Sequence, residues 1–113
     1  MRIAEETIGD VLVEIVNVNR PSIREAEKLK EMVSIRIKNG SNKIVVDLSA
    51  CEFIDSTFLG VLVSSLRKVN KLDGDLRLVG FKPAVKAMFE LTRLFRVFET
   101  YSDLNDAVGS FNK

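Results

Sequence analysis

The amino-acid sequence predicts an α/β fold, with a mixed, mostly parallel β-sheet that has an N-terminal edge hairpin and packs against about four α-helices. Short β-branched runs alternate with amphipathic stretches of helical length, one apolar run shows little alternation, and turn residues separate these segments. Hydrophobic residues make up 46% of the 113 residues, which suffices for one core. We therefore expect a single domain over residues 1–113.

The edge hairpin is predicted at the N-terminus. Apolar and β-branched residues over 11–18 indicate a strand with at least one buried face. Residues Ile3 to Ile8 can pair with it through the turn Gly9-Asp10. The run Asn19-Arg20-Pro21 then breaks the strand pattern.

The first helix and the central strand follow this break. Ser22 and Glu25 form a capping box, apolar residues recur at near-helical spacing, and Asn39-Gly40 stops the pattern. Lys43 to Leu48 holds four apolar residues with little alternation. That pattern is typical of a central strand buried on both faces.

A second helix and a further strand complete a right-handed parallel crossover. The helix carries apolar residues from Leu59 to Val69 and is predicted to end at Asp73-Gly74. Leu76 to Val79 is the next strand. This strand is predicted to lie parallel to the central one.

The remaining segment is predicted to hold two helices and a short strand. Pro83 occupies the first position of a third helix, and Val97-Phe98 indicates a last short strand. Ser102 is predicted to cap a closing helix. The apolar stripe of that helix consists of Leu104, Ala107, Val108 and Phe111.

Composition excludes several classes of function. Seventeen basic and sixteen acidic residues leave a net charge of +1, so no overall field attracts nucleic acid or anionic lipid. The chain has no His and one cysteine, Cys51, which excludes an intrachain disulfide and a multi-ligand zinc site. Its apolar runs fall short of the roughly 20 residues that cross a bilayer. We expect a cytoplasmic protein without cofactor, metal, membrane or nucleic-acid contact, and with Cys51 in its core.

The most informative segment for function runs from Asp47 to Gly60. It connects the end of the predicted central strand to the start of the second helix, where open α/β sheets usually place their sites. Ser56 is expected at the N-cap or in the first turn, beside unpaired N–H groups. A phosphoserine carries a charge of about −1.5 to −2, which the helix terminus partly offsets. A partner docked there would meet this charge beside that of Asp55.

The residues alone leave a simpler interpretation open. In this interpretation Ser56 caps the helix, a contribution of about 1 kcal/mol, and Asp55 supports the turn. Hydroxyl groups near helix starts are too common to specify phosphorylation by themselves.

A longer pattern adds to these observations. A buried strand ends in Asp-Leu-Ser at 47–49, Phe-Ile-Asp-Ser-Thr follows at 53–57, and Leu-Gly at 59–60 begins an apolar helix. Further matching stretches lie at 76–80, 82–89, 94–98 and 102–108. In these motifs the chain resembles the STAS domain family, and in particular bacterial anti-sigma factor antagonists. The resemblance implies an STAS-like sandwich and a regulatory protein that is not an enzyme.

The resemblance also implies roles for individual residues. In the family, the serine directly after the loop aspartate is the phosphoacceptor, which corresponds to Ser56. Asp55 and Thr57 flank it and are expected to contact the partner. The implied partners are an anti-sigma factor that is also a serine kinase, and a phosphatase. The unphosphorylated antagonist binds the anti-sigma factor and frees a sigma factor, whereas the phosphorylated one cannot. A monomer or a weak dimer is compatible with this role.

Two positions depart from the family pattern. The family usually has Gly where this chain has Phe58, which could fill a hydrophobic spot in the partner or pack on the sheet. The family often has a Gly-x-Leu-Asp turn where this chain has Asn17, Val18 and Asn19. Since that turn lies beside the phosphoacceptor loop in the family, Asn19 is expected to bear on the kinase contact.

Two alternative functions remain open from the sequence. The same fold would serve an STAS scaffold or sensor-assembly protein that lacks the sigma switch. A nucleotide-binding protein is the weaker alternative, because a helix N-terminus can accept a phosphate but no Walker-type sequence accompanies it.

Overall fold

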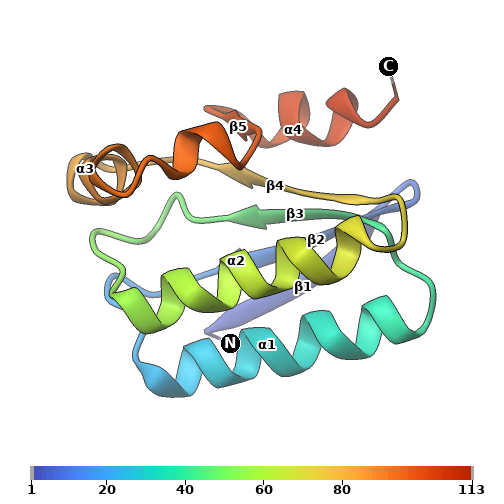
Figure 1. Ribbon diagram of the computed structural model, residues 1–113, viewed down its shortest axis with the longest axis horizontal. Coiled ribbons are helices and arrows are strands. Elements are labelled where there is room, and N and C mark those ends of the chain that lie inside the picture. The colour runs from blue at the N-terminus through green and yellow to red at the C-terminus, as the bar shows by residue number, and fades with distance from the viewer. Residues whose placement is uncertain (1, 113) are drawn as a thin grey trace.

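A computed structural model describes residues 2–112, which form one five-stranded sheet with helices on both faces. The strands are β1 (Ile3–Ile8), β2 (Val11–Val16), β3 (Lys43–Asp47), β4 (Asp75–Val79) and β5 (Thr100–Tyr101). The helices are α1 (Ile23–Lys38), α2 (Ser56–Asn70), α3 (Pro83–Leu91), the short 3₁₀ helix η1 (Leu94–Arg96) and α4 (Leu104–Ser110). Figure 1 shows α1 and α2 side by side across one face of the sheet.

The strand order β1-β2-β3-β4-β5 confirms the predicted mixed sheet. β1 pairs with β2 in an antiparallel hairpin, and every later pair is parallel. Gly9 has a φ of 64° in the hairpin turn, a left-handed conformation that glycine adopts without a steric penalty. Because β2, β3 and β4 are parallel, the loops that follow them meet at one edge of the sheet.

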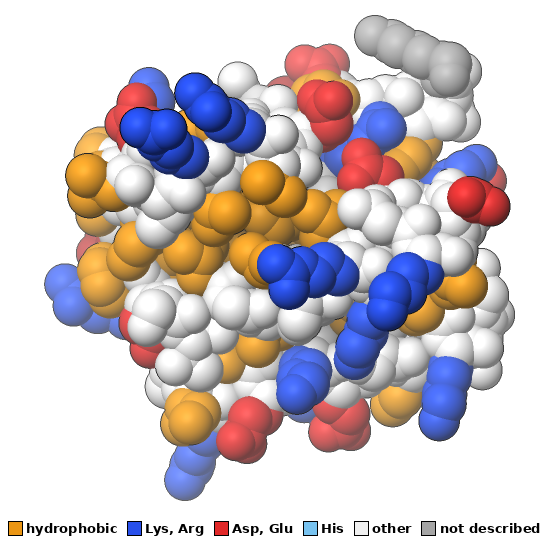
Figure 2. Space-filling model, in the orientation of Figure 1, with side chains coloured by type: hydrophobic (Ala, Val, Ile, Leu, Met, Phe, Trp, Pro, Cys, Tyr) orange, Lys and Arg blue, Asp and Glu red, His pale blue; other side chains and the backbone are white. Residues whose placement is uncertain are grey.

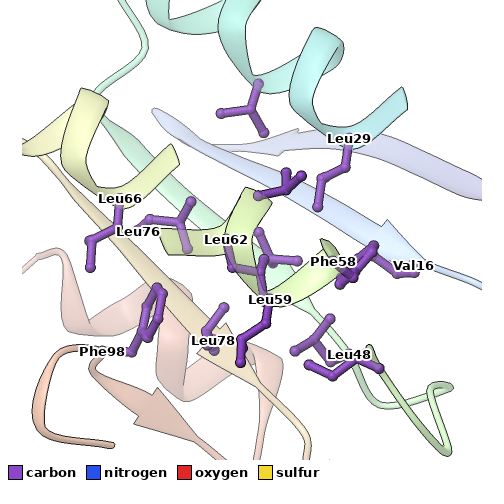
Figure 3. Close-up of a cluster of buried hydrophobic side chains, with 14 of the residues drawn as sticks. Val16, Leu29, Leu48, Phe58, Leu59, Leu62, Leu66, Leu76, Leu78 and Phe98 are labelled. Carbon is purple, nitrogen blue, oxygen red and sulfur yellow. The ribbon is translucent and has the colours of Figure 1, made fainter. Parts of the chain in front are cut away.

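Alternation along the strands divides the apolar side chains between two cores. Leu12 of β2 and Ile44 of β3 belong to the larger core, together with residues of α1, α2 and α3. Val13 and Val45 point to the other face, where they pack with Ala107 and neighbouring residues of α4. Figure 3 shows the larger core, in which side chains of α2 fill the space above β3 and β4.

The start of α1 agrees with the prediction in detail. Ser22 is the N-cap, and its hydroxyl oxygen accepts a hydrogen bond from Arg24 N at 3.2 Å. The Glu25 carboxylate in turn accepts from Ser22 N at 2.7 Å and from Ser22 Oγ at 2.8 Å. The helix ends at Lys38, and Asn39 is its C-cap, as the sequence predicts.

Two expectations for the last quarter of the chain were wrong. Val97 and Phe98 do not form a strand, because the chain turns through η1 there and β5 follows at Thr100–Tyr101. Phe98 is buried against the aromatic ring of Phe89 instead, with ring centroids 6.0 Å apart. The closing helix is capped by Asp103, not by Ser102, since the Asp103 carboxylate accepts from Asp106 N at 3.2 Å.

The second helix also ends earlier than predicted. Its last residue is Asn70, and a turn from Lys71 leads to Gly74 and β4. In this turn Asp73 adopts a φ of 58°, a left-handed conformation that Asp tolerates better than most residues. The predicted stop at Asp73-Gly74 therefore marks the end of the turn.

A buried carboxyl group lies between the sheet and α1. Glu14 of β2 is fully buried and is the cross-strand partner of Glu5 on β1. Burial, together with the neighbouring Glu5, raises the pKa of Glu14 to about 9. Arg36 of α1 donates from Nε to Glu5 Oε1 at 2.9 Å. Glu14 is therefore protonated at neutral pH, which makes its burial beside Glu5 tolerable.

Within residues 2–112, no helix is both long and apolar enough to span a membrane. The same residues include no group of three or more acidic, His or Cys side chains arranged to hold a metal ion.

Candidate functional site

The structure places Ser56 at the first position of α2, directly after the N-cap Asp55. Asp55 Oδ1 accepts a hydrogen bond from Phe58 N at 2.8 Å, so the aspartate satisfies the helix terminus. Ser56 is therefore not the N-cap, and the interpretation in which it merely caps the helix is wrong. The expected structural role of Asp55 is confirmed.

The Ser56 side chain is exposed at the open end of α2. Ser56, Asp55 and Thr57 are all exposed, and the described residues include no hydrogen-bond partner for Ser56 Oγ. The first intrahelical backbone hydrogen bond runs from Leu59 N to Asp55 O at 3.0 Å, which leaves the N–H groups of Ser56 and Thr57 at the open end of the helix. The positive end of the helix dipole lies at the same place.

The turn after β2 holds the loop that leads to Ser56. The backbone oxygen of Asn19 accepts from Glu52 N at 2.8 Å and from Phe53 N at 3.2 Å. The guanidinium carbon of Arg20 lies 5.6 Å from the centroid of the Phe53 ring, a cation–π distance. The expected proximity of Asn19 to the loop is confirmed, and the contact is made by its backbone while its side chain stays exposed.

Buried side chains anchor the loop to the core. Leu48, Cys51 and Ile54 are fully buried, and Cys51 Sγ lies 3.9 Å from Val16 O as a weak hydrogen-bond donor. Burial raises the pKa of the Cys51 thiol to about 11, with a smaller contribution from Asp47. The thiol is therefore protonated at neutral pH, which agrees with the core role that the sequence predicts for Cys51.

Phe58 packs inside the protein. Its side chain is fully buried, and Figure 3 shows it among the side chains between α2 and the sheet. Phe58 lies four residues before Leu62, on the face of α2 that packs on the sheet. Of the two alternatives that the sequence left open for Phe58, the structure supports packing on the sheet, because a fully buried side chain presents no surface to a partner.

A groove extends from Ser56 along the exposed side of α2. Ser56, Gly60, Val63 and Arg67 follow one another at helical spacing on one wall, and Thr92 and Leu94 form the other wall. The groove has a volume of about 420 Å³. Figure 2 shows hydrophobic side chains along the hollow between α2 and the segment from α3 to η1.

The groove and the exposure of Phe53 were not predicted from the sequence. Thr92 and Leu94 are brought to α2 by the tertiary fold, so no local pattern could reveal them. Phe53 is 38% exposed beside Arg20, whereas the neighbouring apolar loop residues Cys51 and Ile54 are buried. The helical spacing from Ser56 to Arg67 was a signal available in the sequence.

Known proteins share both the sequence pattern and the fold. The chain matches the family model described as STAS domain over residues 6–107. A relative from Thermotoga neapolitana is 32% identical over 102 residues, 89% of each chain, and its name contains the words anti-sigma factor antagonist. The anti-sigma-B factor antagonist of Staphylococcus aureus is 28% identical over 90 residues, covering 80% of this chain and 83% of the relative.

Solved structures agree with this likeness. A crystal structure of a Thermotoga maritima protein, also described as an anti-sigma factor antagonist, superposes with a TM-score of 0.90 at 28% identity. The superposition covers 98% of this chain and 95% of that one. An anti-sigma factor antagonist from Mycobacterium paratuberculosis superposes with a TM-score of 0.87 at 26% identity, covering 98% and 93% of the two chains.

Proposed function

Because the chain belongs to the STAS domain family, we propose that it is an anti-sigma factor antagonist that phosphorylation of Ser56 switches off. The proposal takes residues 1–113 as one domain that acts by binding in the cytoplasm and has no catalysis of its own. The observation that carries it is the exposed Ser56 at the first position of α2, with the cap supplied by Asp55.

The proposed modification needs no rearrangement of the fold. The Ser56 hydroxyl oxygen attacks the γ-phosphorus of ATP held by the partner kinase, the bond to ADP breaks, and the hydroxyl proton passes to the kinase. The product phosphoserine lies at the positive end of α2, which offsets part of its charge of about −1.5 to −2. Asp55 keeps its hydrogen bond to Phe58 N, so the helix start is preserved.

The groove beside Ser56 supports this site as a docking surface for the anti-sigma factor. It offers apolar contacts at Val63 and Leu94 and a positive charge at Arg67. A Cβ atom added to Gly60 would meet nothing within 4 Å in this chain. Since glycine in a helix interior costs about 1 kcal/mol relative to alanine, a partner that approaches closely gives Gly60 a function.

Phosphorylation then acts by charge at the mouth of this groove. The dianion adds to the charge of Asp55, the residue just before it, so an acidic partner surface is repelled, and an apolar partner surface would strip water from the phosphate at a cost in free energy. In the proposed cycle the free antagonist holds the anti-sigma factor, and the phosphorylated one releases it. A phosphatase restores the binding form.

The proposed site is tested by incubating the protein with the serine kinase anti-sigma factors of the same organism and ATP. Intact mass should rise by one phosphate for the wild type, and the Ser56→Ala variant should not change. Thr57→Ala is the matched control, because Thr57 is exposed at the next position of the same helix turn. A phosphate on the Ser56→Ala variant, or none on Thr57→Ala, would contradict the assignment of Ser56.

A further inference from the structure

A second groove lies at the opposite end of α2, between the last turns of α1 and α2. Ile35, Ile37 and Lys38 line it from α1, and Lys68, Lys71 and Leu72 line it from the end of α2 and the turn that follows. We call this surface the α1–α2 groove. Its volume is about 740 Å³, larger than that of the groove beside Ser56.

The floor of the α1–α2 groove is apolar and exposed. Ile35 is 51% exposed and Leu72 is 46% exposed, whereas most large aliphatic side chains of this protein are buried. Ile37 is partly buried and continues from the groove into the larger core. Contiguous exposed apolar side chains rimmed by polar groups are typical of protein interaction sites.

The rim of this groove is positively charged. Lys38, Lys68 and Lys71 face a single acidic residue, Glu31, which leaves an excess of positive charge. Lys68 Nζ donates to Ser34 Oγ at 3.2 Å, which positions its ammonium group between the two helices. Figure 2 shows Lys and Arg side chains over the region where α1 and α2 end. Lysines near helix C-termini also offset the helix dipoles, but this role does not explain the exposed Ile35 and Leu72.

We propose that the α1–α2 groove binds an acidic amphipathic helix of a partner protein. An apolar stripe on such a helix would cover Ile35 and Leu72, and acidic residues beside the stripe would pair with Lys38 and Lys71. Helix-in-groove recognition of this kind uses apolar anchors flanked by complementary charges. This interaction goes beyond the proposed sigma switch.

Other occupants fit the α1–α2 groove less well. A second copy of this groove would bring the same lysines, so a symmetric dimer through it would place like charges together. A lipid bilayer is a broad surface that does not fill a concavity between two helices. Nucleic acid presents a charged phosphate backbone that does not match the apolar floor of Ile35 and Leu72, and no aromatic side chain in the described part of the chain lines this groove for base stacking.

The α1–α2 groove should remain open when Ser56 is phosphorylated. The 15 residues of α2 place Ser56 about 22 Å from the end of the helix at 1.5 Å per residue. Charges on the surface are screened over about 8 Å at physiological ionic strength. A partner held at this groove would therefore stay bound through the proposed phosphorylation cycle.

The test is an NMR titration of the ¹⁵N-labelled protein with a synthetic helical peptide of about 18 residues that has a leucine stripe flanked by glutamates. Shifts are expected at 31–38 and 68–72, with equal affinity for the wild type and Ser56→Asp. The triple variant Lys38→Glu, Lys68→Glu, Lys71→Glu should weaken binding at least tenfold. Lys82→Glu, Lys86→Glu, Arg93→Glu is the matched control with the same change of charge, and it should bind as the wild type does.

Four results would overturn the proposal. The first is an equal affinity for a peptide in which every glutamate is replaced by lysine, and the second is a set of shifts centred on Ser56. The third is stronger binding to vesicles of phosphatidylglycerol and phosphatidylcholine that the triple variant abolishes, which would identify a membrane surface. The fourth is self-association in sedimentation that the same variant abolishes, which would identify a second copy of the chain.

Ile35→Ser, with its backbone spectrum otherwise unchanged, should weaken peptide binding without altering net charge.

Discussion

The two long helices of this protein both have a serine at their start, but the two serines are used differently. Ser22 is the N-cap of α1, and its hydroxyl is engaged with Arg24 N and Glu25. Ser56 stands one position further into α2, where Asp55 already supplies the cap. A displacement of one residue thus separates a hydroxyl that stabilises the fold from one that is exposed and, in the proposed function, is phosphorylated.

The comparison also shows what each helix start contributes to function. The capping box of α1 closes the start of that helix with two side chains from the same chain. The start of α2 has one capping carboxylate and an exposed hydroxyl beside a groove. The start of α2 therefore has space for a phosphate and for a docked partner. At the start of α1 the serine hydroxyl is already engaged in the capping box.

The largest expected effect on the free energy of unfolding comes from a change of pH. The stabilities of variants at the two helix starts must therefore be measured at one fixed pH. The pKa of Glu14 is about 9 in the folded protein and about 4.5 in the unfolded chain. The stability that this group contributes is therefore complete below pH 4.5 and is lost as pH rises toward 9. Between these values the free energy of unfolding should fall by about 1.4 kcal/mol per pH unit.

Urea denaturation from pH 5 to pH 8.5 measures this slope. Glu14→Gln should flatten it, because the amide has the shape of the protonated carboxyl and does not titrate. An unchanged slope in this variant would assign the pH dependence to other groups.

Removing the cap of α2 is expected to have the next largest effect. Asp55→Ala should lower the free energy of unfolding by about 1 to 2 kcal/mol, because Phe58 N loses its acceptor. Ser22→Ala should cost about 1 kcal/mol for the same reason at α1. Urea denaturation at pH 6 measures both. Equal stability of Asp55→Ala and the wild type would show that the helix start does not depend on this cap.

Gly60→Ala is expected to change stability and partner affinity in opposite directions. Because a Cβ atom meets nothing within 4 Å there, the substitution should stabilise the protein by about 0.5 to 1 kcal/mol. The same methyl group narrows the groove, so affinity for the anti-sigma factor should fall severalfold. Thermal melting and calorimetry measure the two quantities. A variant that is more stable and binds equally well would remove Gly60 from the docking surface.

Ser56→Ala is expected to have the smallest effect on stability, within about 0.5 kcal/mol, because the cap belongs to Asp55. The matching substitution Ser22→Ala should cost more. Urea denaturation of the two variants side by side tests the comparison directly. A loss at Ser56 as large as that at Ser22 would show that both hydroxyls stabilise their helices.

Local patterns in the sequence predicted much of this structure. The capping box of Ser22 and Glu25, the buried strand at 43–47 and the hairpin turn at Gly9 depend on neighbouring residues, so local chemistry determines them. The orientation of Phe58 was left open, because one residue in a first helical turn does not define which face is buried. The last quarter was predicted least well, since Phe98 is held by aromatic packing with a distant residue.

The candidate site was predicted in part. Position and motif identified Ser56 and Asp55, but they could not decide which residue caps the helix, because both Asp and Ser are favoured N-caps. The groove needs α2 and the segment from α3 to η1 to come together, and the sequence shows no such contact. Ser56 itself was identified from the sequence, and the structure reveals the groove that surrounds it.

The most direct test of the account is the affinity of the anti-sigma factor for the two forms of this protein, measured by calorimetry at one pH and one salt concentration. The account predicts binding of the unphosphorylated protein and a loss of at least tenfold on phosphorylation of Ser56, with the fold unchanged by circular dichroism. Equal affinity of the two forms would contradict it, because an exposed Ser56 would then have no role as a switch.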